Sequence, residues 1–303
     1  MQTETLTETK KQATIGGSEI SVVMGLNRWK TPLRLFAEKT GKITTEDISD
    51  REYIQLGNEL EDFVARKFSK VTGKKVRRDT KTFKHKKYPY MIGHIDRRIV
   101  GTDELLECKT CNAWKAHEWE GEEIPQEYIL QVLWYLGVLG MSKGYIAVLI
   151  GGQKFMWKEI AFDQELFDQM VEAAKSFVEH HIAEDVAPIA VSGDSSTLNR
   201  IYPEQTEAIM TTEDKEVTTL LEEIQALKRI INNTETEKEE KEAKLKQKIG
   251  EAEGVETPKF KALWKAQQSV RVDTQKLKSD GLYDKYSVSK VIRVLRINEK
   301  KVR

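Results

Sequence analysis

The sequence GHIDRRIVGTDELLECKT, residues 93–110, contains the pattern on which the expected fold depends. Two runs with apolar residues, 94–100 and 105–108, flank the turn sequence Gly-Thr-Asp, and this order predicts a β-hairpin. We place the centre of the protein at this hairpin because its polar residues are unusual for buried strands.

Three of these polar residues are Asp96, Glu107 and Lys109. Because side chains alternate across a strand, Glu107 and Lys109 point to one face and Cys108 to the other. A register that brings Asp96 to the first face gathers two carboxylates and one ammonium. Neighbouring carboxylates favour Mg²⁺ or Mn²⁺, and the ammonium can orient or deprotonate an attacking water. The D-x10-E-x-K spacing therefore predicts a metal-dependent nuclease site, with an ordinary charged hairpin as the alternative.

Length and composition suit a globular protein with a core and an appendage. The chain has 303 residues, 39% of them hydrophobic, and a formal net charge of zero. Charge is nevertheless uneven: residues 74–98 contain ten Lys or Arg against two Asp, 207–256 are acidic and 259–303 are basic. Local patches, rather than total charge, are therefore expected to contact nucleic acid.

The sequence has no apolar run near eighteen residues and no signal segment, so we expect a cytoplasmic protein. Its two cysteines, Cys108 and Cys111, form a C-x-x-C, which can be a redox pair or half of a zinc site. No second such pair completes a metal cage, and we interpret both as ordinary thiols of a reducing compartment.

The segment IGGSEISVVMGL predicts a glycine turn followed by a helix with Ser18 as its N-cap. Free N–H groups at such a helix start, the Ser18 hydroxyl and the nearby Lys11 can bind a phosphate. An ordinary capped helix is the alternative. A second helix is expected after Thr31 as N-cap, with Pro32 at its first position and Gly41 beyond its end.

A long helix is expected over residues 49–72, with an apolar face formed by Tyr53, Leu56, Leu60, Phe63, Val64 and Phe68. Glu61 lies at the edge of this face, where it can turn toward a metal. The basic region after Gly73 predicts a pair of strands with a cationic outer side, suited to phosphate contacts. A basic surface without a ligand is the alternative.

Residues 128–139 predict an apolar helix with Gln131 and Tyr135 on one face. A buried Gln needs a hydrogen-bond partner, and we expect Lys109 to be that partner. Strands over 144–150 and 155–160 and a helix over 163–182 complete an α/β arrangement of hairpin, helix, strand and helix.

Four motifs in this order resemble the family of lambda exonuclease and the YqaJ-type viral recombination nucleases, within the PD-(D/E)xK superfamily. They are GGSEIxxxxG, GNELE, D-x10-E-x-K and the Q-x-x-x-Y of Gln131 to Tyr135, and the resemblance covers residues 10–185. It implies a central mixed β-sheet flanked by helices.

The resemblance also implies roles for individual residues. Asp96, Glu107, the Cys108 carbonyl and Glu61 would bind Mg²⁺, with two ions in the mechanism and Mn²⁺ as a substitute.

In the same family, Lys109 would activate water and Gln131 would hold Lys109, while Ser18 and Lys11 would bind the 5′-phosphate. Two positions depart from the family: Lys11 replaces the usual Arg, and Leu133 replaces a second Gln.

The implied function is a Mg²⁺-dependent 5′-3′ exonuclease that digests double-stranded DNA and leaves 3′ single strands for recombination. Related nucleases form trimeric rings, and the product would pass to a phage single-strand annealing protein in a bacterial host. The alternatives are a structure-selective or restriction-type endonuclease and a non-catalytic DNA-binding module.

The expected domain boundary separates a nuclease core, 1–190, from a helical C-terminal extension, 191–303. A short heptad seam in the extension consists of Val217, Leu220, Ile224, Leu227 and Ile231. Residues 250–258 interrupt it, a further helix is expected from Phe260, and a basic tail ends in the strand-like VIRVLRI, 291–297. The extension is expected to pack on the core, with DNA or a partner protein as alternative contacts.

Overall fold

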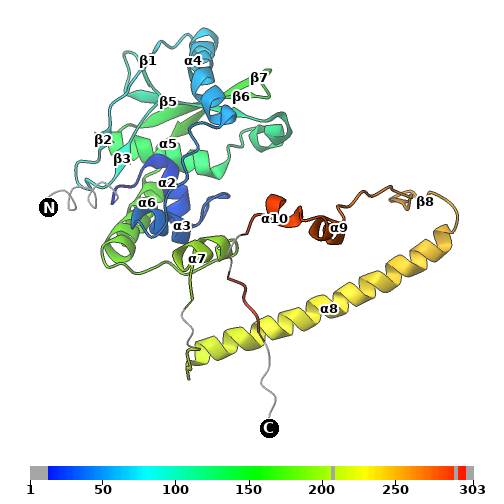
Figure 1. The fold of residues 1–303 in the computed structure, drawn as a ribbon. Coiled ribbons are helices and arrows are strands. Elements are labelled where there is room, and N and C mark those ends of the chain that lie inside the picture. Colours follow the sequence, from blue (N-terminus) through cyan, green and yellow to red (C-terminus); the bar gives the residue numbers. More distant parts are fainter. Residues whose placement is uncertain (1–12, 206–208, 290–292, 298–303) are drawn as a thin grey trace. The chain divides into compact units, whose positions relative to one another are not determined.

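A computed structural model describes residues 13–205, 209–289 and 293–297, and the chain forms two compact units, Met1–Tyr202 and Pro203–Arg303 (Figure 1). The first unit continues past the expected boundary at residue 190. Its last helix, α7 (Ser195–Ile201), packs on α3 (Pro32–Lys39), where the Thr31 hydroxyl donates a hydrogen bond to Asp194. The end of the first unit is thus fixed by contacts with its beginning.

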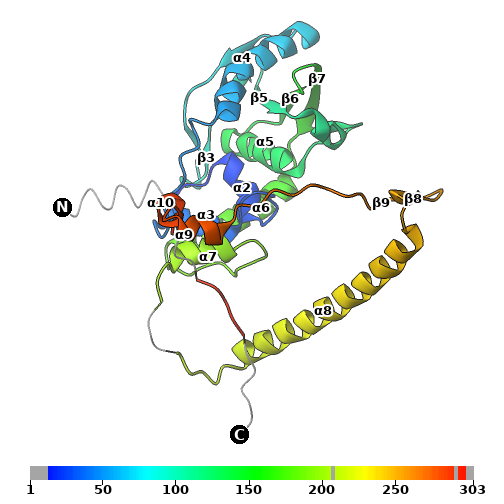
Figure 2. The same ribbon diagram turned by 45° about the vertical axis from the view of Figure 1, so that its right-hand side comes forward.

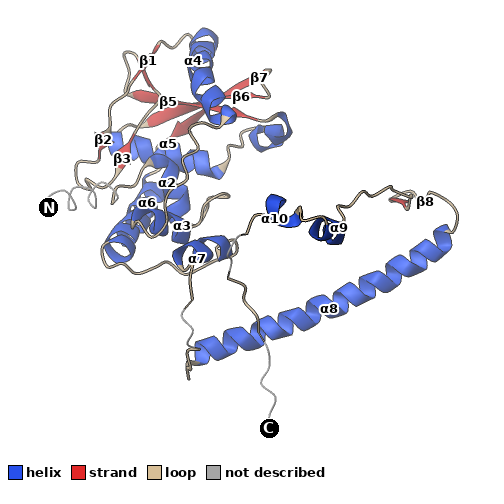
Figure 3. Ribbon diagram, viewed as in Figure 1, coloured by secondary structure: helices blue, strands red, loops and turns tan. Residues whose placement is uncertain are grey.

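The first unit is built on a mixed five-stranded sheet in the order β1-β4-β5-β6-β7 (Figure 3). The central strands β5 and β6 run parallel, and the other neighbours are antiparallel. The helix α5 (Gln126–Leu139) lies between β5 and β6 in the chain and forms the crossover that parallel strands require. The strands are β1 (Val76–Arg78), β4 (Arg97–Ile99), β5 (Glu104–Cys111), β6 (Lys143–Ile150) and β7 (Lys154–Ala161).

Two helices cover opposite faces of this sheet, α4 (Glu52–Thr72) on one and α5 on the other (Figures 1 and 2). On β5, Leu106 and Cys108 pack in the cluster that includes Val64 and Phe68 of α4. Leu105 belongs to the cluster that contains the apolar residues of α5. Because side chains alternate along a strand, the odd-numbered residues of β5 face α5.

The predicted hairpin is present, but its strands differ in length. The first strand is only Arg97–Ile99, and the second extends to Cys111. The basic region contains a strand pair, as predicted, and one further strand that joins the main sheet. β1 pairs with β4, with Val76 opposite Ile99, whereas β2 (Phe83–Lys84) pairs with β3 (Ile92–Gly93). Val76 packs against the α4-side cluster, and this burial explains why β1 joins the main sheet.

The N-terminal helices begin as follows. Thr31 caps α3 by accepting a hydrogen bond from the Arg34 N–H at 3.1 Å, as predicted. Ser18 does not cap α2 (Gly17–Val23), so that prediction was wrong. Gly16 is the N-cap, and its N–H donates to the Glu19 carboxylate at 2.9 Å, because a residue three positions into the helix can reach back.

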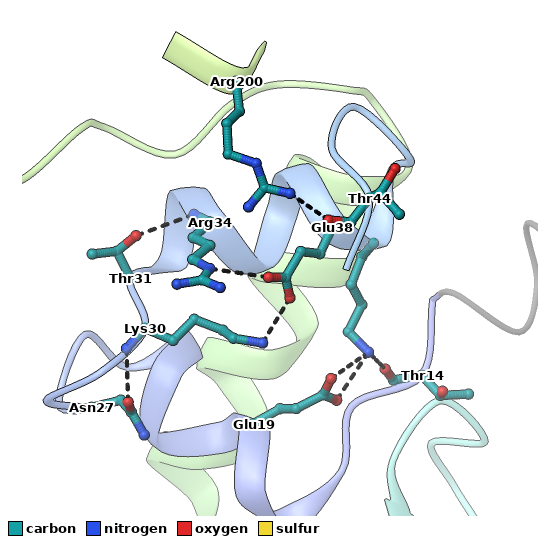
Figure 4. A network of polar contacts seen from close by, with 10 residues as sticks. Thr14, Glu19, Asn27, Lys30, Thr31, Arg34, Glu38, Thr44 and Arg200 are labelled. Carbon is teal, nitrogen blue, oxygen red and sulfur yellow. Dashed lines mark hydrogen bonds and ion pairs between the residues drawn. The ribbon is translucent and has the colours of Figure 1, made fainter. Parts of the chain in front are cut away.

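A network of polar contacts connects α2 and α3 (Figure 4). Lys30 and Arg34 donate to the Glu38 carboxylate at 2.7 and 3.1 Å. Lys39 donates to the Thr14 carbonyl at 2.7 Å and also pairs with Glu19. The chain on both sides of the glycine turn is therefore held by α3.

The expected apolar face of α4 was only half right. Val64 and Phe68 are buried, but Tyr53, Leu56 and Phe63 are exposed. Helical periodicity alone does not show how far the sheet extends beneath a helix, and the sheet-side cluster reaches back only to Leu60.

The remaining helical segments of the first unit are η1 (Ala113–Trp119), α6 (Gln164–Ser176) and the π-helical η2 (Phe177–Ile182). Within the described residues, no helix is long and apolar enough to cross a membrane.

The second unit contains the helix α8 (Lys215–Ile249), on which Leu220, Leu227 and Ile231 of the heptad seam are exposed. The helix expected from Phe260 was wrong: β8 (Gly254–Glu256) and β9 (Lys261–Leu263) form a two-stranded ribbon. Two short helices follow, α9 (Thr274–Ser279) and α10 (Tyr283–Tyr286). Residues 293–297 form no strand, and 291–292 lie outside the described residues.

Gly17 of α2 packs directly against the Tyr135 ring of α5, and this contact generates a prediction. A Cβ atom at Gly17 would lie 2.4 Å from Cε1 of Tyr135, whereas one at Gly16 would meet its first neighbour at 3.8 Å. Gly17→Ala should therefore lower the free energy of unfolding by about 1–3 kcal/mol. Gly16→Ala, the matched control, meets no steric clash and should lower it by less, about 0.5–1 kcal/mol, because alanine is a poorer N-cap than glycine. Urea unfolding followed by tryptophan fluorescence measures both values, and equal stability of the two variants would contradict this packing.

Candidate active site

Asp96 and Glu107 meet at the start of β4, where Asp96 directly precedes the strand. Arg97 pairs with Leu106 in the β4–β5 register, and continuing this register by one residue places Asp96 across from Glu107. At this point β4 no longer provides backbone partners, and Asp96 Oδ2 accepts the Cys108 N–H at 2.8 Å instead. The Cys108 carbonyl lies on the same edge of β5, because the N–H and C=O of one strand residue face the same neighbour.

Glu107 is the most enclosed carboxylate of the site, with 2% of its surface exposed. Its Oε1 accepts hydrogen bonds from Lys109 Nζ at 2.7 Å and from Gln131 Nε2 at 2.8 Å. Its Oε2 is buried and has no hydrogen-bond partner among the described residues. An unpaired buried carboxylate oxygen is costly, so this atom is suited to a ligand that supplies positive charge.

The electrostatics of the site also favour a cation. Burial, followed by the charge of Glu107, raises the pKa of Asp96 to about 7. Burial likewise raises the pKa of Glu107. Both shifts mean that the site holds two carboxylates with too little compensating charge. Oxygen donors with this deficit fit a divalent cation such as Mg²⁺.

Lys109 remains positively charged in this environment. Burial by itself lowers its pKa, but the charges of Glu107 and Asp96 outweigh burial and the pKa is raised overall. The ammonium also lies 5.1 Å from the ring centre of Tyr128. Lys109 is thus placed to donate hydrogen bonds and to attract negative charge.

The predicted partner of Gln131 was wrong, because Gln131 binds Glu107 rather than Lys109. Its Nε2 also donates to the Tyr135 hydroxyl at 3.0 Å. The Tyr135 ring lies against Gly17, so the Q-x-x-x-Y motif connects the buried carboxylate of Glu107 with the start of α2. Sequence spacing showed that Gln131 and Tyr135 lie on one face of the helix. It did not show whether Gln131 would bind Glu107 or Lys109.

Glu61 binds Arg97, a residue that the sequence analysis missed. The Arg97 guanidinium pairs with Glu61 and Asp62 of α4 and donates to the Asp96 carbonyl at 2.7 Å. Glu61 is still close enough for its charge to raise the pKa values of Asp96 and Glu107. Strand alternation could have revealed Arg97, since the neighbour of an α5-facing Asp96 must face α4.

The residues expected to bind a 5′-phosphate are only partly described. Ser18 is exposed in the first turn of α2, and Lys11 lies outside the described residues. Within the described part of the chain, no group of three or more His, Cys, Asp or Glu side chains forms a ready metal cage. The candidate ligands are therefore the two carboxylates and the adjacent backbone carbonyl, with Glu61 nearby.

The sheet and the helices on its two faces make the first unit an α/β protein, with one carboxylate on β5 and another just before β4. Comparison with known families matches residues 8–142 to the YqaJ-like viral recombinase domain. The uncharacterized protein YqaJ of Bacillus subtilis (strain 168) is 40% identical over 281 residues, which is 89% of this chain and 86% of that protein. The chain belongs to the YqaJ-like viral recombinase family.

Solved structures of lower identity are also similar to this chain. An alkaline exonuclease (LHK-Exo) from Laribacter hongkongensis is 18% identical, with a TM-score of 0.48 over 57% of this chain and 91% of that one. A phage-related exonuclease from Haemophilus somnus 129PT is 16% identical, with a TM-score of 0.44 over 57% and 96% of the two chains.

The raised pKa of Asp96 predicts a pH-dependent stability of the metal-free protein. An unfolded Asp titrates near 3.9, so between about pH 4 and pH 7 the folded state binds this proton more tightly. The contribution of Asp96 to the free energy of unfolding therefore falls as pH rises, by at most roughly 1.4 kcal/mol per pH unit. Asp96→Asn cannot ionise but keeps an oxygen for the Cys108 N–H. Its stability should increasingly exceed that of the wild type across this interval.

Urea unfolding in EDTA at about pH 5 and about pH 8 measures this difference. Asp103→Asn, at an exposed carboxylate of the same hairpin, is the matched control. A stability difference between Asp96→Asn and wild type that is the same at both pH values would show that Asp96 keeps one charge state throughout.

Proposed function

We propose that this protein is a Mg²⁺-dependent 5′-3′ exonuclease that digests double-stranded DNA from its ends. The observation that carries the proposal is the unpaired, buried Oε2 of Glu107 beside Asp96 and Lys109, in a member of a viral recombinase family. If the Glu107–Lys109 ion pair were purely structural, both oxygens of the buried carboxylate would be expected to have hydrogen-bond partners.

Asp96, Glu107 and the Cys108 carbonyl would hold the metal, and Glu61 would join them if the Arg97 contact rearranges. A bound divalent cation supplies the charge that lowers the pKa of an attacking water and stabilises a leaving oxygen. Gln131 keeps Glu107 Oε1 occupied and so directs Oε2 toward the ligand. A carboxylate fixed in this way loses little freedom on binding.

Lys109 would orient the attacking water and attract the scissile phosphate. Its raised pKa keeps it protonated in the metal-free protein, which favours orientation over proton abstraction. A fixed ammonium beside the reacting phosphate stabilises negative charge as it develops.

Basic residues on and after β1 would contact the DNA backbone. Not all of the cationic stretch is available, because Lys74 pairs with Glu104 and Arg98 with Asp79. Seven other basic side chains are exposed: Lys75, Arg77, Arg78, Lys81, Lys84, Lys86 and Lys87. Such contacts position a duplex without reading its sequence. A trimeric ring and transfer of the 3′ strand to a phage single-strand annealing protein complete the proposal.

Substitutions of Asp96 and Lys109 should separate metal binding from catalysis. Asp96→Ala removes an oxygen donor and should abolish both. Lys109→Ala should keep metal binding but lower kcat by about 100-fold or more, because it removes a group that acts on the reacting atoms. Calorimetric titration with Mg²⁺ and initial rates on a linear duplex measure the two effects. Lys154→Ala, at an exposed position of β7, is the control, and rapid cleavage by either site variant would refute the assignment.

The choice of DNA end should distinguish an exonuclease from an endonuclease. A linear duplex should be digested and a closed circle left intact. If Ser18 and Lys11 bind a terminal phosphate, a 5′-phosphate end should be digested about tenfold faster than a 5′-hydroxyl end, since one charge-assisted hydrogen bond is worth roughly 1.5–3 kcal/mol. Ser18→Ala with Lys11→Ala should remove most of that preference. Cleavage of the circle would favour an endonuclease, and equal rates on both ends would exclude this phosphate site.

A further inference from the structure

Two tryptophans of the first unit are largely exposed to solvent. Trp29 is 56% exposed and Trp114 is 75% exposed, although tryptophan is usually mostly buried. The Lys115 ammonium lies 5.0 Å from the ring centre of Trp29, so the residue after Trp114 reaches Trp29 directly. Lys115 thus joins Trp29 to the chain segment that contains Trp114, and we call Trp29, Trp114 and Lys115 together the tryptophan patch.

Local hydrogen bonds hold both tryptophans at the surface. Asn27 Oδ1 accepts the N–H groups of Trp29 and Lys30 at 2.9 and 3.0 Å, which fixes the turn before α3. In η1, the Lys115 N–H donates to the Asn112 carbonyl at 3.1 Å. The exposed rings thus belong to defined turns of the backbone.

Contacts connect this patch with the candidate active site. Arg28 donates to Glu127 at 2.7 Å and also pairs with Glu118, while its guanidinium lies 5.3 Å from the ring centre of Trp29. The neighbour of Glu127, Tyr128, lies beside the Lys109 ammonium. The tryptophan patch is therefore connected, through Arg28 and the first turn of α5, with the helix whose Tyr128 contacts Lys109.

We propose that the tryptophan patch binds unpaired bases of the DNA substrate by stacking. Exposed indole rings beside a lysine are suited to single-stranded DNA, because each base has a π face and each nucleotide carries a phosphate. A cation over an exposed ring is held more weakly than a stacked base, so a base can displace the Lys115 ammonium. Arg28 stays in place because it is paired with Glu118 and Glu127. The displaced Lys115 ammonium can then contact the phosphate of the stacked nucleotide.

This inference rests on the proposed function for its substrate, DNA, but it concerns binding and not cleavage. Where base pairs open at a duplex end, they expose unpaired bases, and a stacking surface on the same domain as Lys109 would hold them. It tolerates any sequence, as an enzyme that degrades long DNA requires.

The test measures binding of a fluorescent oligothymidylate in EDTA, which prevents cleavage. Trp29→Ala and Trp114→Ala should each weaken binding by about tenfold, and Trp29→Phe and Trp114→Phe should retain most of the affinity because they keep an aromatic face. Tyr53→Ala, at an exposed aromatic residue of α4 on the opposite side of the sheet, should leave affinity unchanged. Circular dichroism of each variant confirms that it is folded.

Salt dependence separates stacking from charge. The logarithm of the binding constant falls linearly with the logarithm of the salt concentration, and the tryptophan variants should keep the wild-type slope of this line. Lys115→Gln should make the slope less steep because it removes a phosphate contact. A general structural defect would not divide the variants in this way.

Wild-type oligothymidylate affinity in the Trp29→Ala, Trp114→Ala double variant would overturn the proposal. If that variant instead loses self-association at unchanged DNA affinity, the patch is a protein interface and the proposal is again wrong. Cleavage of a linear duplex, assayed separately with Mg²⁺, distinguishes failure of this inference from failure of the proposed function.

Discussion

A carboxylate in the middle of a buried strand is the constraint on which the first unit depends. Glu107 occupies β5 where the sheet is covered on both faces, and a charge in such a position must be compensated. Lys109, on the same strand, and Gln131, on the crossover helix, both donate hydrogen bonds to Oε1 of Glu107. The helix is therefore needed for the site as well as for the core, and Tyr135 extends this requirement to the glycine turn of α2.

The position at which β4 begins is equally important. A longer strand would pair with Cys108 through its backbone and leave no place for the Asp96 carboxylate. Because β4 begins at Arg97, the side chain of Asp96 takes over the Cys108 N–H and brings its charge beside Glu107. Arg97 then faces α4 and ties Glu61 to the same place. One short strand thus positions groups on both faces of the sheet.

The sequence predicted those features whose signals lie close together in the chain. The cap at Thr31, the hairpin and the shared face of Glu107 and Lys109 follow from local spacing, and the structure contains all three. Features that depend on distant contacts were missed. The partner of Gln131, the Arg97 ion pairs and the pairing of β1 with β4 are decided by which surfaces meet after folding. The ribbon of β8 and β9 was missed because Phe260 and Leu263 fit a helical spacing equally well.

The crossover through α5 has a further consequence for the order in which the site is assembled. The β4–β5 hairpin contains Asp96, Glu107 and Lys109 within a short piece of chain, whereas Gln131 arrives only when α5 docks on the sheet. A chain with the hairpin formed and α5 undocked would leave Glu107 in water, where two neighbouring carboxylates need little compensation. Docking of one helix therefore converts a solvated pair of acids into a desolvated pair whose charge requires compensation.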